Sequence, residues 1–193
     1  PSIIKTFKDM NKKIFLDLKF HDIPNTMSAA SYQVSKLGVD MISLHASAGL
    51  NALQLSKEAT LKASKEINNK PPEVIAVTVL TSLSSRNFKY ELNRNSTIQE
   101  NVVSLSSLSY KAGLDGCVCS PLEVQSIRDI YADKLTLVTP GIRFDRNNIN
   151  DQSRFMSPED AISSGASKIV VGRAITKNIN PSKIFSEICE SIS

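Results

Sequence analysis

Short, nearly continuous apolar runs alternate along the chain with longer stretches of helical periodicity. The runs are rich in Val, Ile and Leu, which is typical of strands that are covered on both faces of a sheet. Six of them are predicted to be strands, at residues 14–18, 39–45, 74–80, 115–119, 134–138 and 167–171. Helices are predicted near 27–37, 50–67, 97–112, 121–132, 158–164 and 181–192, and the chain starts in a further helical pattern. Regular alternation of strand and helix predicts a parallel sheet with crossover helices.

Three of the predicted helices begin with a polar residue followed by proline. Proline fits the first helical turn, where its missing N–H is not needed, and the polar side chain before it can cap the helix. The three pairs are Ser120-Pro121, Ser157-Pro158 and Asn180-Pro181.

The pattern fits two fold classes, an open doubly wound α/β sheet and a (β/α)₈ barrel. A barrel would need two strand–helix units beyond these six, and about 250 residues is typical for one. The sequence has no Gly-rich dinucleotide fingerprint or P-loop to support an open nucleotide-binding sheet. Two irregular stretches, 82–95 and 140–157, each follow the C-terminal end of a strand, where both folds place their chemistry. We expect residues 1–193 to form a single domain.

Three charged residues interrupt the end of the first predicted strand. Asp17 and Lys19 lie two residues apart and should therefore point to the same face, and Asp22 follows just past the strand. A buried charge is costly unless it is partnered, so the charges form either an ion pair that pins the strand end or a functional group. Their concentration at a strand's C-terminal end favours function.

Composition narrows the class of protein. The 193 residues carry a net charge of +4, which suits a small anionic substrate or serves solubility. The basic residues are scattered, so nucleic-acid binding is not expected, and no apolar run approaches the roughly 18 residues of a membrane helix. Three cysteines include one C-x-C with no second pair, which favours reduced thiols in a cytoplasmic protein over a zinc site.

Several motifs together resemble one family. "DLKFHDIPNT" (17–26) is similar to the signature of orotidine 5'-monophosphate decarboxylase in its bacterial form. The family's other motifs follow in the same order: "VTVLTS" (77–82), "VTPGIR" (138–143), "DQSRFMSPEDAISSGASKIVVGRAIT" (151–176) and "NP" (180–181). The resemblance spans nearly the whole chain, and the IPNT, DQ-x-R and VVGR segments are more specific than D-x-K-x-x-D alone.

The resemblance implies a (β/α)₈ barrel that works as a homodimer with shared active sites. This chain shows about six strand–helix units of that barrel. The family's first two units, which carry a ribose-binding aspartate and a second lysine, have no counterpart in the sequence. We therefore do not expect these residues alone to close an eight-stranded barrel.

The activity implied is the decarboxylation of orotidine 5'-monophosphate to uridine 5'-monophosphate, without metal or organic cofactor. In this resemblance Lys19 donates the proton to C6, Asp17 faces the substrate carboxylate and holds Lys19, and Asp22 reaches into the partner's site. The implied substrate-binding residues are Ile23 and Thr26 beside Asp22, Thr81 and Ser82 at the pyrimidine amide edge, and Arg143, Gln152, Gly172 and Arg173 at the phosphate.

Two other functions stay open from the residues. A metal-dependent sugar-phosphate lyase of the same superfamily would share D-x-K-x-x-D, but it would bring an acidic metal ligand ahead of that motif, where this chain has Ile14, Phe15 and Leu16. The missing second lysine would also fit a protein that binds nucleotide phosphates without catalysis. His21 and His45 are interpreted as structural residues near the site.

Overall fold

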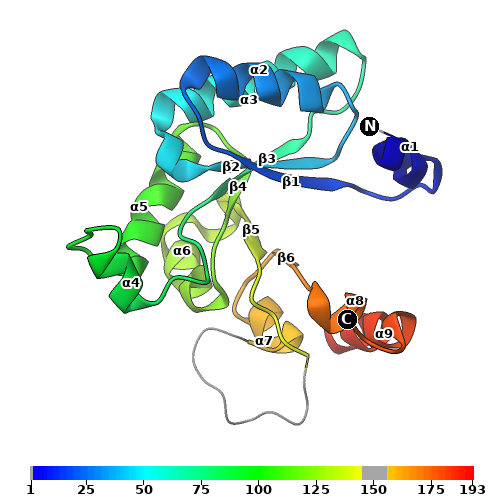
Figure 1. Cartoon of the computed structure of the whole chain (residues 1–193), viewed down its shortest axis with the longest axis vertical. Coiled ribbons are helices and arrows are strands. Elements are labelled where there is room, and N and C mark those ends of the chain that lie inside the picture. Colours follow the sequence, from blue (N-terminus) through cyan, green and yellow to red (C-terminus); the bar gives the residue numbers. More distant parts are fainter. Residues whose placement is uncertain (1, 145–155) are drawn as a thin grey trace. The chain divides into compact units, whose positions relative to one another are not determined.

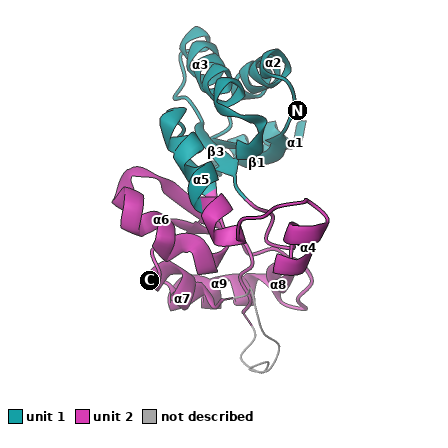
Figure 2. Cartoon of the chain, turned by 90° about the vertical axis from the view of Figure 1, so that its left-hand side faces the viewer, with its two compact units in different colours: residues 1–78, 103–117 teal, residues 79–102, 118–193 magenta. Residues whose placement is uncertain are grey.

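The computed structural model describes residues 2–144 and 156–193. The chain divides into two compact units, which Figure 2 colours separately. Unit 1 contains residues 1–78 and 103–117, and unit 2 contains residues 79–102 and 118–193. The expected single domain stays a prediction.

Unit 1 is built on parallel strands that follow their order in the sequence. β1 pairs with β2 and β2 pairs with β3, and the Asp115 N–H donates to the Val74 C=O (3.1 Å) where the fourth strand begins. The elements are α1 (Ser2–Asp9), β1 (Phe15–Phe20), α2 (Pro24–Ser35), β2 (Met41–His45), η1 (Ala46–Ala48), α3 (Leu50–Glu66), β3 (Glu73–Val77), most of α5 (Ile98–Lys111) and the start of β4 (Gly116–Val118).

The core of unit 1 lies beneath helices α2 and α3, which pack side by side in Figures 1 and 2. Small buried residues such as Ser31 and Ser35 on α2 and Ala63 on α3 let the two helices approach closely. Leu44 and Leu53, both fully buried, belong to the apolar cluster below them. The buried β2 and β3 are consequently fixed in register, and β2 and its neighbour β1 carry the charged group described below.

Unit 2 continues the same alternation. The Cys119 N–H donates to the Val138 C=O (3.2 Å), and β5 pairs in parallel with β6. The elements are the end of β4, α4 (Ser85–Tyr90), the start of α5, η2 (Pro121–Glu123), α6 (Val124–Tyr131), η3 (Ala132–Lys134), β5 (Thr136–Thr139), α7 (Pro158–Ser163), β6 (Lys168–Ile169), α8 (Arg173–Thr176) and α9 (Pro181–Ser191).

All six predicted strands are confirmed, and so are the predicted helices and the three polar caps. Ser157 Oγ accepts the Asp160 N–H (3.1 Å), and Asn180 Oδ1 accepts the Lys183 N–H (3.2 Å). Ser120 forms a capping box, in which Glu123 accepts the Ser120 N–H at 2.7 Å. Because the caps satisfy N–H groups that lack helical partners, they fix where these helices begin.

Two expectations about local structure are wrong in part. Strand β1 is not covered on both faces, since Asp17, Leu18 and Lys19 are exposed and, among the described strands of unit 1, β1 pairs only with β2. The stretch 82–95 is not wholly irregular, because it contains α4, capped by Ser84. In the stretch 140–157, Ile142 forms an isolated parallel bridge with Met156, and residues 145–155 lie outside the described ones.

None of the helices in the described part of the chain is long and apolar enough to cross a membrane.

Candidate active site

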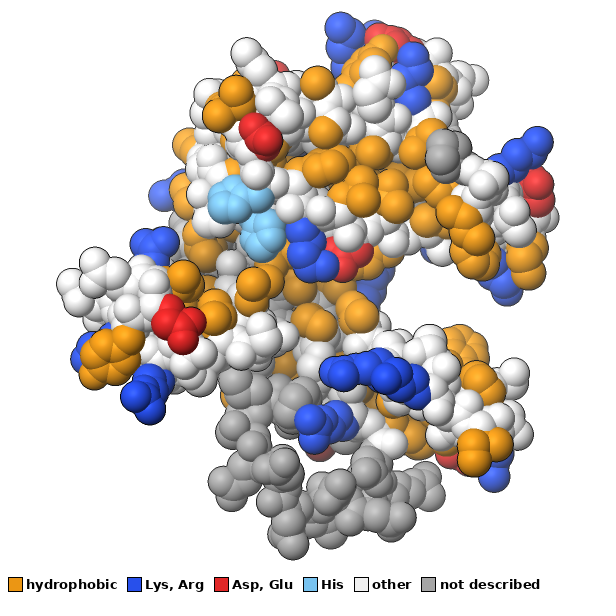
Figure 3. Space-filling model, viewed as in Figure 1, with side chains coloured by type: hydrophobic (Ala, Val, Ile, Leu, Met, Phe, Trp, Pro, Cys, Tyr) orange, Lys and Arg blue, Asp and Glu red, His pale blue; other side chains and the backbone are white. Residues whose placement is uncertain are grey.

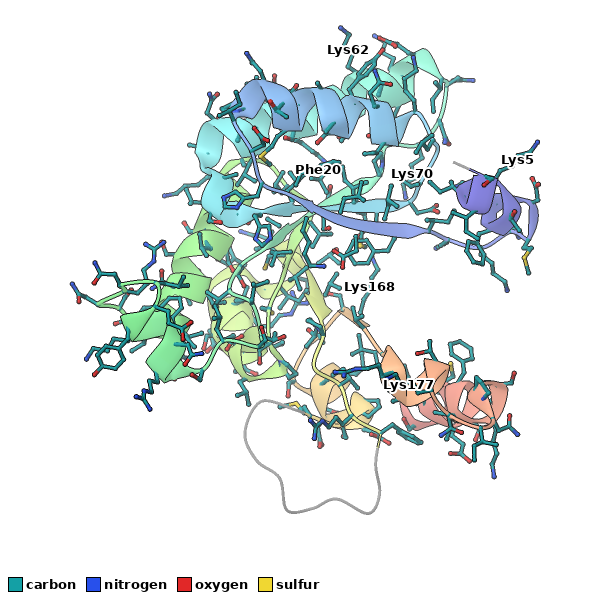
Figure 4. All side chains as sticks on the ribbon, viewed as in Figure 1. Lys5, Phe20, Lys62, Lys70, Lys168 and Lys177 are labelled. Carbon is teal, nitrogen blue, oxygen red and sulfur yellow. The ribbon has the colours of Figure 1, made fainter. Side chains whose placement is uncertain are left out.

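The charged group of unit 1 lies near the end of β1, and Figure 4 labels Phe20, the last residue of that strand. Asp17 and Lys19 form an ion pair, as their spacing predicted. Ser43 of β2 joins them, because its hydroxyl donates to Asp17 Oδ1 (2.6 Å) and accepts the Lys19 backbone N–H (2.9 Å). A carboxylate, an ammonium and a hydroxyl are thus held together by two neighbouring strands.

The backbone of Lys19 lies in the left-handed region, with φ of 51°. Few residues other than glycine, asparagine and aspartate adopt such a φ, and it costs about 1–2 kcal/mol. The pairing of β1 with β2 also shifts register between Leu16 and Phe20. A bulge of this kind changes the direction of side chains, and here it accompanies the turn of the Lys19 ammonium toward Asp17.

Two histidines lie next to the charged group. The ring centroids of His21 and His45 are 5.2 Å apart, and His21 Nε2 lies 3.5 Å from Ser47 Oγ. Figure 3 shows both rings, in pale blue, beside a basic and an acidic side chain. Burial lowers the pKa of His45 below its ordinary value of 6.5, the positive charges of His21 and Lys19 lower it further, and Asp17 acts in the opposite direction.

Asp22, Ile23 and Thr26 are exposed at the start of α2. Asp22 Oδ1 accepts the Ile23 N–H (2.7 Å), and the Ile23 side chain is 67% exposed. Within the described part of unit 1, no hydrogen bond or ion pair joins Asp22 to Asp17 or Lys19. The predicted contact of these three residues with a second subunit stays a prediction.

Gly172 and Arg173 follow β6 in unit 2, on the segment between Lys168 and Lys177 in Figure 4. Gly172 precedes α8, and a Cβ added to it would meet no atom within 4 Å. The Arg173 side chain is exposed, and within the described part of unit 2 its guanidinium has no hydrogen-bond or ion-pair partner. Gly172 therefore leaves its backbone accessible to a ligand, and the guanidinium of Arg173 is accessible beside it.

The other predicted binding residues of unit 2 lie in turns and loops. Thr81 and Ser82 are the central residues of a turn closed by the Leu83 N–H and the Leu80 C=O (3.1 Å). Arg143 is exposed, and its backbone N–H donates to the Met156 C=O (3.1 Å). Gln152 lies outside the described residues.

Sequence reasoning missed Ser43. Its only signal was its place in β2, the strand next to the charged one, and a serine in an apolar strand suggests no chemistry by itself. Residues 2–144 and 156–193 contain no cluster of three or more His, Cys, Asp or Glu side chains that could hold a metal ion.

Comparison with known proteins agrees on one family. The model of the orotidine 5'-phosphate decarboxylase / HUMPS family matches residues 1–188. A protein of Prochlorococcus marinus subsp. pastoris (strain CCMP1986 / NIES-2087 / MED4), named orotidine 5'-phosphate decarboxylase, is 59% identical over 192 residues, which cover 100% of this chain and 80% of the relative. Its namesake in strain MIT 9215 of the same species is 57% identical over 100% of this chain and 79% of the relative.

A solved structure extends this likeness to the fold. The crystal structure of orotidine 5'-phosphate decarboxylase from Lactobacillus acidophilus is 34% identical, with a TM-score of 0.86 over 99% of this chain and 80% of that one. The predicted fold class is confirmed: this is an α/β chain of the (β/α)₈ barrel type, of which it shows six strand–helix units.

Proposed function

The chain belongs to the orotidine 5'-phosphate decarboxylase / HUMPS family, and from this premise we propose that it converts orotidine 5'-monophosphate to uridine 5'-monophosphate with Lys19 as the proton donor. The protein is a carboxy-lyase of pyrimidine biosynthesis, as its relatives are. Both Prochlorococcus relatives are named orotidine 5'-phosphate decarboxylase, which favours this reaction over that of the sugar-phosphate lyase. The observation that carries the assignment of Lys19 is its ion pair with Asp17, fixed by Ser43.

The difficulty of the reaction is electrostatic. The bond between C6 and the carboxylate breaks, carbon dioxide leaves, and the electron pair stays on an sp² carbon with no π-system to absorb it. The Lys19 ammonium stabilises that charge as it develops, and its proton then passes to C6. Lys19 regains a proton from solvent, so no metal or organic cofactor is required in this proposal.

Asp17 has two roles in this mechanism. It holds Lys19, and it faces the substrate carboxylate, which it repels. Two carboxylates about 4 Å apart repel by about 4 kcal/mol at an effective dielectric constant of about 20. That corresponds to about a thousandfold in rate, which is small beside enzymatic accelerations. The attraction of Lys19 and binding energy from a remote part of the substrate must supply the rest.

We propose the phosphate as that remote part. The open backbone at Gly172 and the available guanidinium of Arg173 suit phosphate oxygens, and barrels commonly bind phosphate after their last strands. Arg143 and Gln152 are proposed to assist at the phosphate, with Gln152 also reaching the base. Thr81 and Ser82 are proposed to bond the pyrimidine amide edge.

A homodimer with shared active sites is also proposed. Ile23, which is 67% exposed, and the exposed Asp22 beside it are both accessible to a second copy at the start of α2. In this proposal Asp22, Ile23 and Thr26 complete the partner's site.

We also propose a cytoplasmic location for the enzyme. Its free cysteines, Cys117, Cys119 and Cys189, are consistent with that location.

Lys19→Ala tests the proton donor. We expect kcat to fall by about 10⁴-fold or more, because general acid catalysis and charge stabilisation are lost together. Binding of uridine 5'-monophosphate should change by less than about tenfold. The matched control is Lys57→Ala, since Lys57 also pairs with an aspartate of unit 1, Asp115 (2.6 Å), and should affect only stability. Near-normal turnover of Lys19→Ala would refute the assignment.

Two further measurements separate the alternatives. Turnover that survives excess EDTA excludes the metal-dependent lyase, and binding without turnover favours the non-catalytic protein.

The shared active sites of the proposed dimer are tested by mixing two variants. Lys19→Ala and Asp22→Ala should each be inactive alone. Mixed and re-equilibrated, they should recover about a quarter of wild-type activity, since half of the dimers then carry one intact site. No recovery would contradict shared sites.

A further inference from the structure

Ser43 of β2 lies opposite the bulged segment of β1. Leu16 pairs with Ile42 and Phe20 pairs with Leu44, so three residues of β1, 17–19, lie opposite Ser43 alone. The side chain of Ser43 is fully buried, although it lies beside an exposed ion pair. One buried hydroxyl group therefore lies opposite the bulged segment and bonds to two of its three residues, Asp17 and Lys19.

The two hydrogen bonds of Ser43 fix different parts of the charged group. The bond from the Lys19 N–H (2.9 Å) satisfies the backbone of the residue with φ of 51°. The bond to Asp17 Oδ1 (2.6 Å) fixes one carboxylate oxygen, while the other oxygen pairs with the Lys19 ammonium. A hydroxyl can donate one hydrogen bond and accept others at the same time, which alanine and valine cannot do.

We propose that Ser43 is a positioning residue for decarboxylation, which holds the left-handed backbone of Lys19 and the orientation of Asp17 so that the ammonium meets C6. The inference rests on the proposed function, because it assumes that Lys19 is the proton donor. Ser43 acts through these two residues and is not itself assigned a contact with substrate. A misplaced donor costs rate in the chemical step and leaves substrate binding largely intact.

Three variants of Ser43 test this. Ser43→Ala removes the hydroxyl, while Ser43→Thr and Ser43→Val add the same volume and differ only in whether a hydroxyl is present. Comparison of the last two cancels the effect of packing an extra methyl group at a buried position. The control is Ser56→Ala, which removes an equally buried serine hydroxyl bonded to the Ala52 C=O (2.7 Å) on α3.

We expect kcat to fall about 10- to 100-fold in Ser43→Ala, with KM and the dissociation constant of uridine 5'-monophosphate within about threefold of wild type. Ser43→Thr should have a kcat at least about tenfold above that of Ser43→Val, and Ser56→Ala should keep wild-type kcat.

Equal kcat in Ser43→Thr and Ser43→Val would overturn the proposal, even where Ser43→Ala is too unstable to assay. Loss of binding in place of loss of kcat would overturn it as well. Failure of the proposed function is distinguishable, because the wild-type protein would then bind uridine 5'-monophosphate without turning over orotidine 5'-monophosphate, and failure of the proton-donor assignment would appear as near-normal turnover in Lys19→Ala. An inactive Lys19→Ala beside a fully active Ser43→Val would refute the role of Ser43 alone.

Discussion

The two groups of candidate residues differ in how they are held before any substrate binds. In unit 1, Asp17, Lys19 and Ser43 fix one another through an ion pair and two hydrogen bonds. In unit 2, Arg173 is exposed without a side-chain partner among that unit's described residues, and Gly172 faces open space. The first group is organised by the protein, and the second is available to be organised by a ligand.

This difference matches what each group has to do. Stabilising a carbanion requires charges that are already in place, because reorganising them during the reaction would cost part of the rate enhancement. A phosphate is charged from the outset and can order an arginine fork when it binds. Substitutions of Asp17, Lys19 or Ser43 should therefore act mainly on kcat, and substitutions of Gly172 or Arg173 mainly on kcat/KM for phosphorylated substrate.

Asp17→Asn should give the largest effect among the tests of this comparison. Asparagine keeps the shape and an acceptor for Ser43 but loses the charge, so kcat should fall about a thousandfold. Binding of uridine 5'-monophosphate, measured by titration, should change by less than about tenfold. Asp115→Asn serves as the control, because Asp115 pairs with Lys57 and accepts the Val74 N–H (2.6 Å) in the same unit. Equal losses of kcat in both variants would mean that only stability had been measured.

Arg173→Ala should lower kcat/KM for orotidine 5'-monophosphate about 10- to 100-fold. This is the loss of rate that corresponds to the free energy of one charge-assisted hydrogen bond, or of one bidentate arginine contact. The same variant should act on the nucleoside orotidine within about threefold of wild type, because the lost contact is to phosphate. Arg86→Ala, at an exposed arginine of α4 in the same unit, should change neither rate. Equal losses on both substrates would remove Arg173 from the phosphate site.

Gly172→Ala and Gly165→Ala should behave in opposite ways. At Gly172 the added methyl group meets no protein atom, so the melting temperature should hold, while kcat/KM for the phosphorylated substrate falls up to about tenfold. At Gly165, φ is 101° and the new Cβ would lie 3.1 Å from Arg128 Cγ, so stability should fall with kcat/KM unchanged. Calorimetry and steady-state kinetics on both variants check this, and a destabilised but fully active Gly172→Ala would contradict it.

Much of the fold could be predicted from the sequence because buried strands leave a strong apolar pattern. The polar caps at Ser120, Ser157 and Asn180 then placed helix starts. The α-helices α4 and α8, which the pattern did not predict, are six and four residues long in the described part of the chain, too short for periodicity to show. The exposure of β1 could not be predicted from its apolar pattern alone, because it also depends on which strands cover it.

In the charged group, contacts could be predicted only between residues that lie close together in the sequence. The two-residue spacing of Asp17 and Lys19 indicated that their side chains would lie close together, but it did not indicate the bulge through which they pair. The left-handed backbone of Lys19 has no local signal, since lysine is not a residue that favours positive φ. The role of Ser43 depends on the register of β1 against β2 across a bulge, which only the folded structure defines.

The pH dependence of stability that arises from His45 is the smallest expected effect. It tests whether the charged group of unit 1 is held so firmly that protonation of the neighbouring His45 lowers the stability of the fold. Its pKa is lowered by burial, then by His21 and Lys19, so the unfolded chain takes up a proton near pH 6.5 and the folded chain only at lower pH. Stability should therefore be lost as pH falls from about 6.5 toward the folded pKa, and should be insensitive to this group above that window.

Between pH 7.5 and 5.5, the wild-type melting temperature should fall further than that of His45→Asn, because only the wild type loses stability as His45 takes up its proton. The comparison is made between the two pH values within each protein, so any packing lost in the variant cancels. Asn replaces the ring with a smaller polar group that does not titrate. Equal losses of melting temperature in both proteins would mean that the neighbourhood of Lys19 adapts to an additional positive charge, and the contrast between the two groups of residues would weaken accordingly.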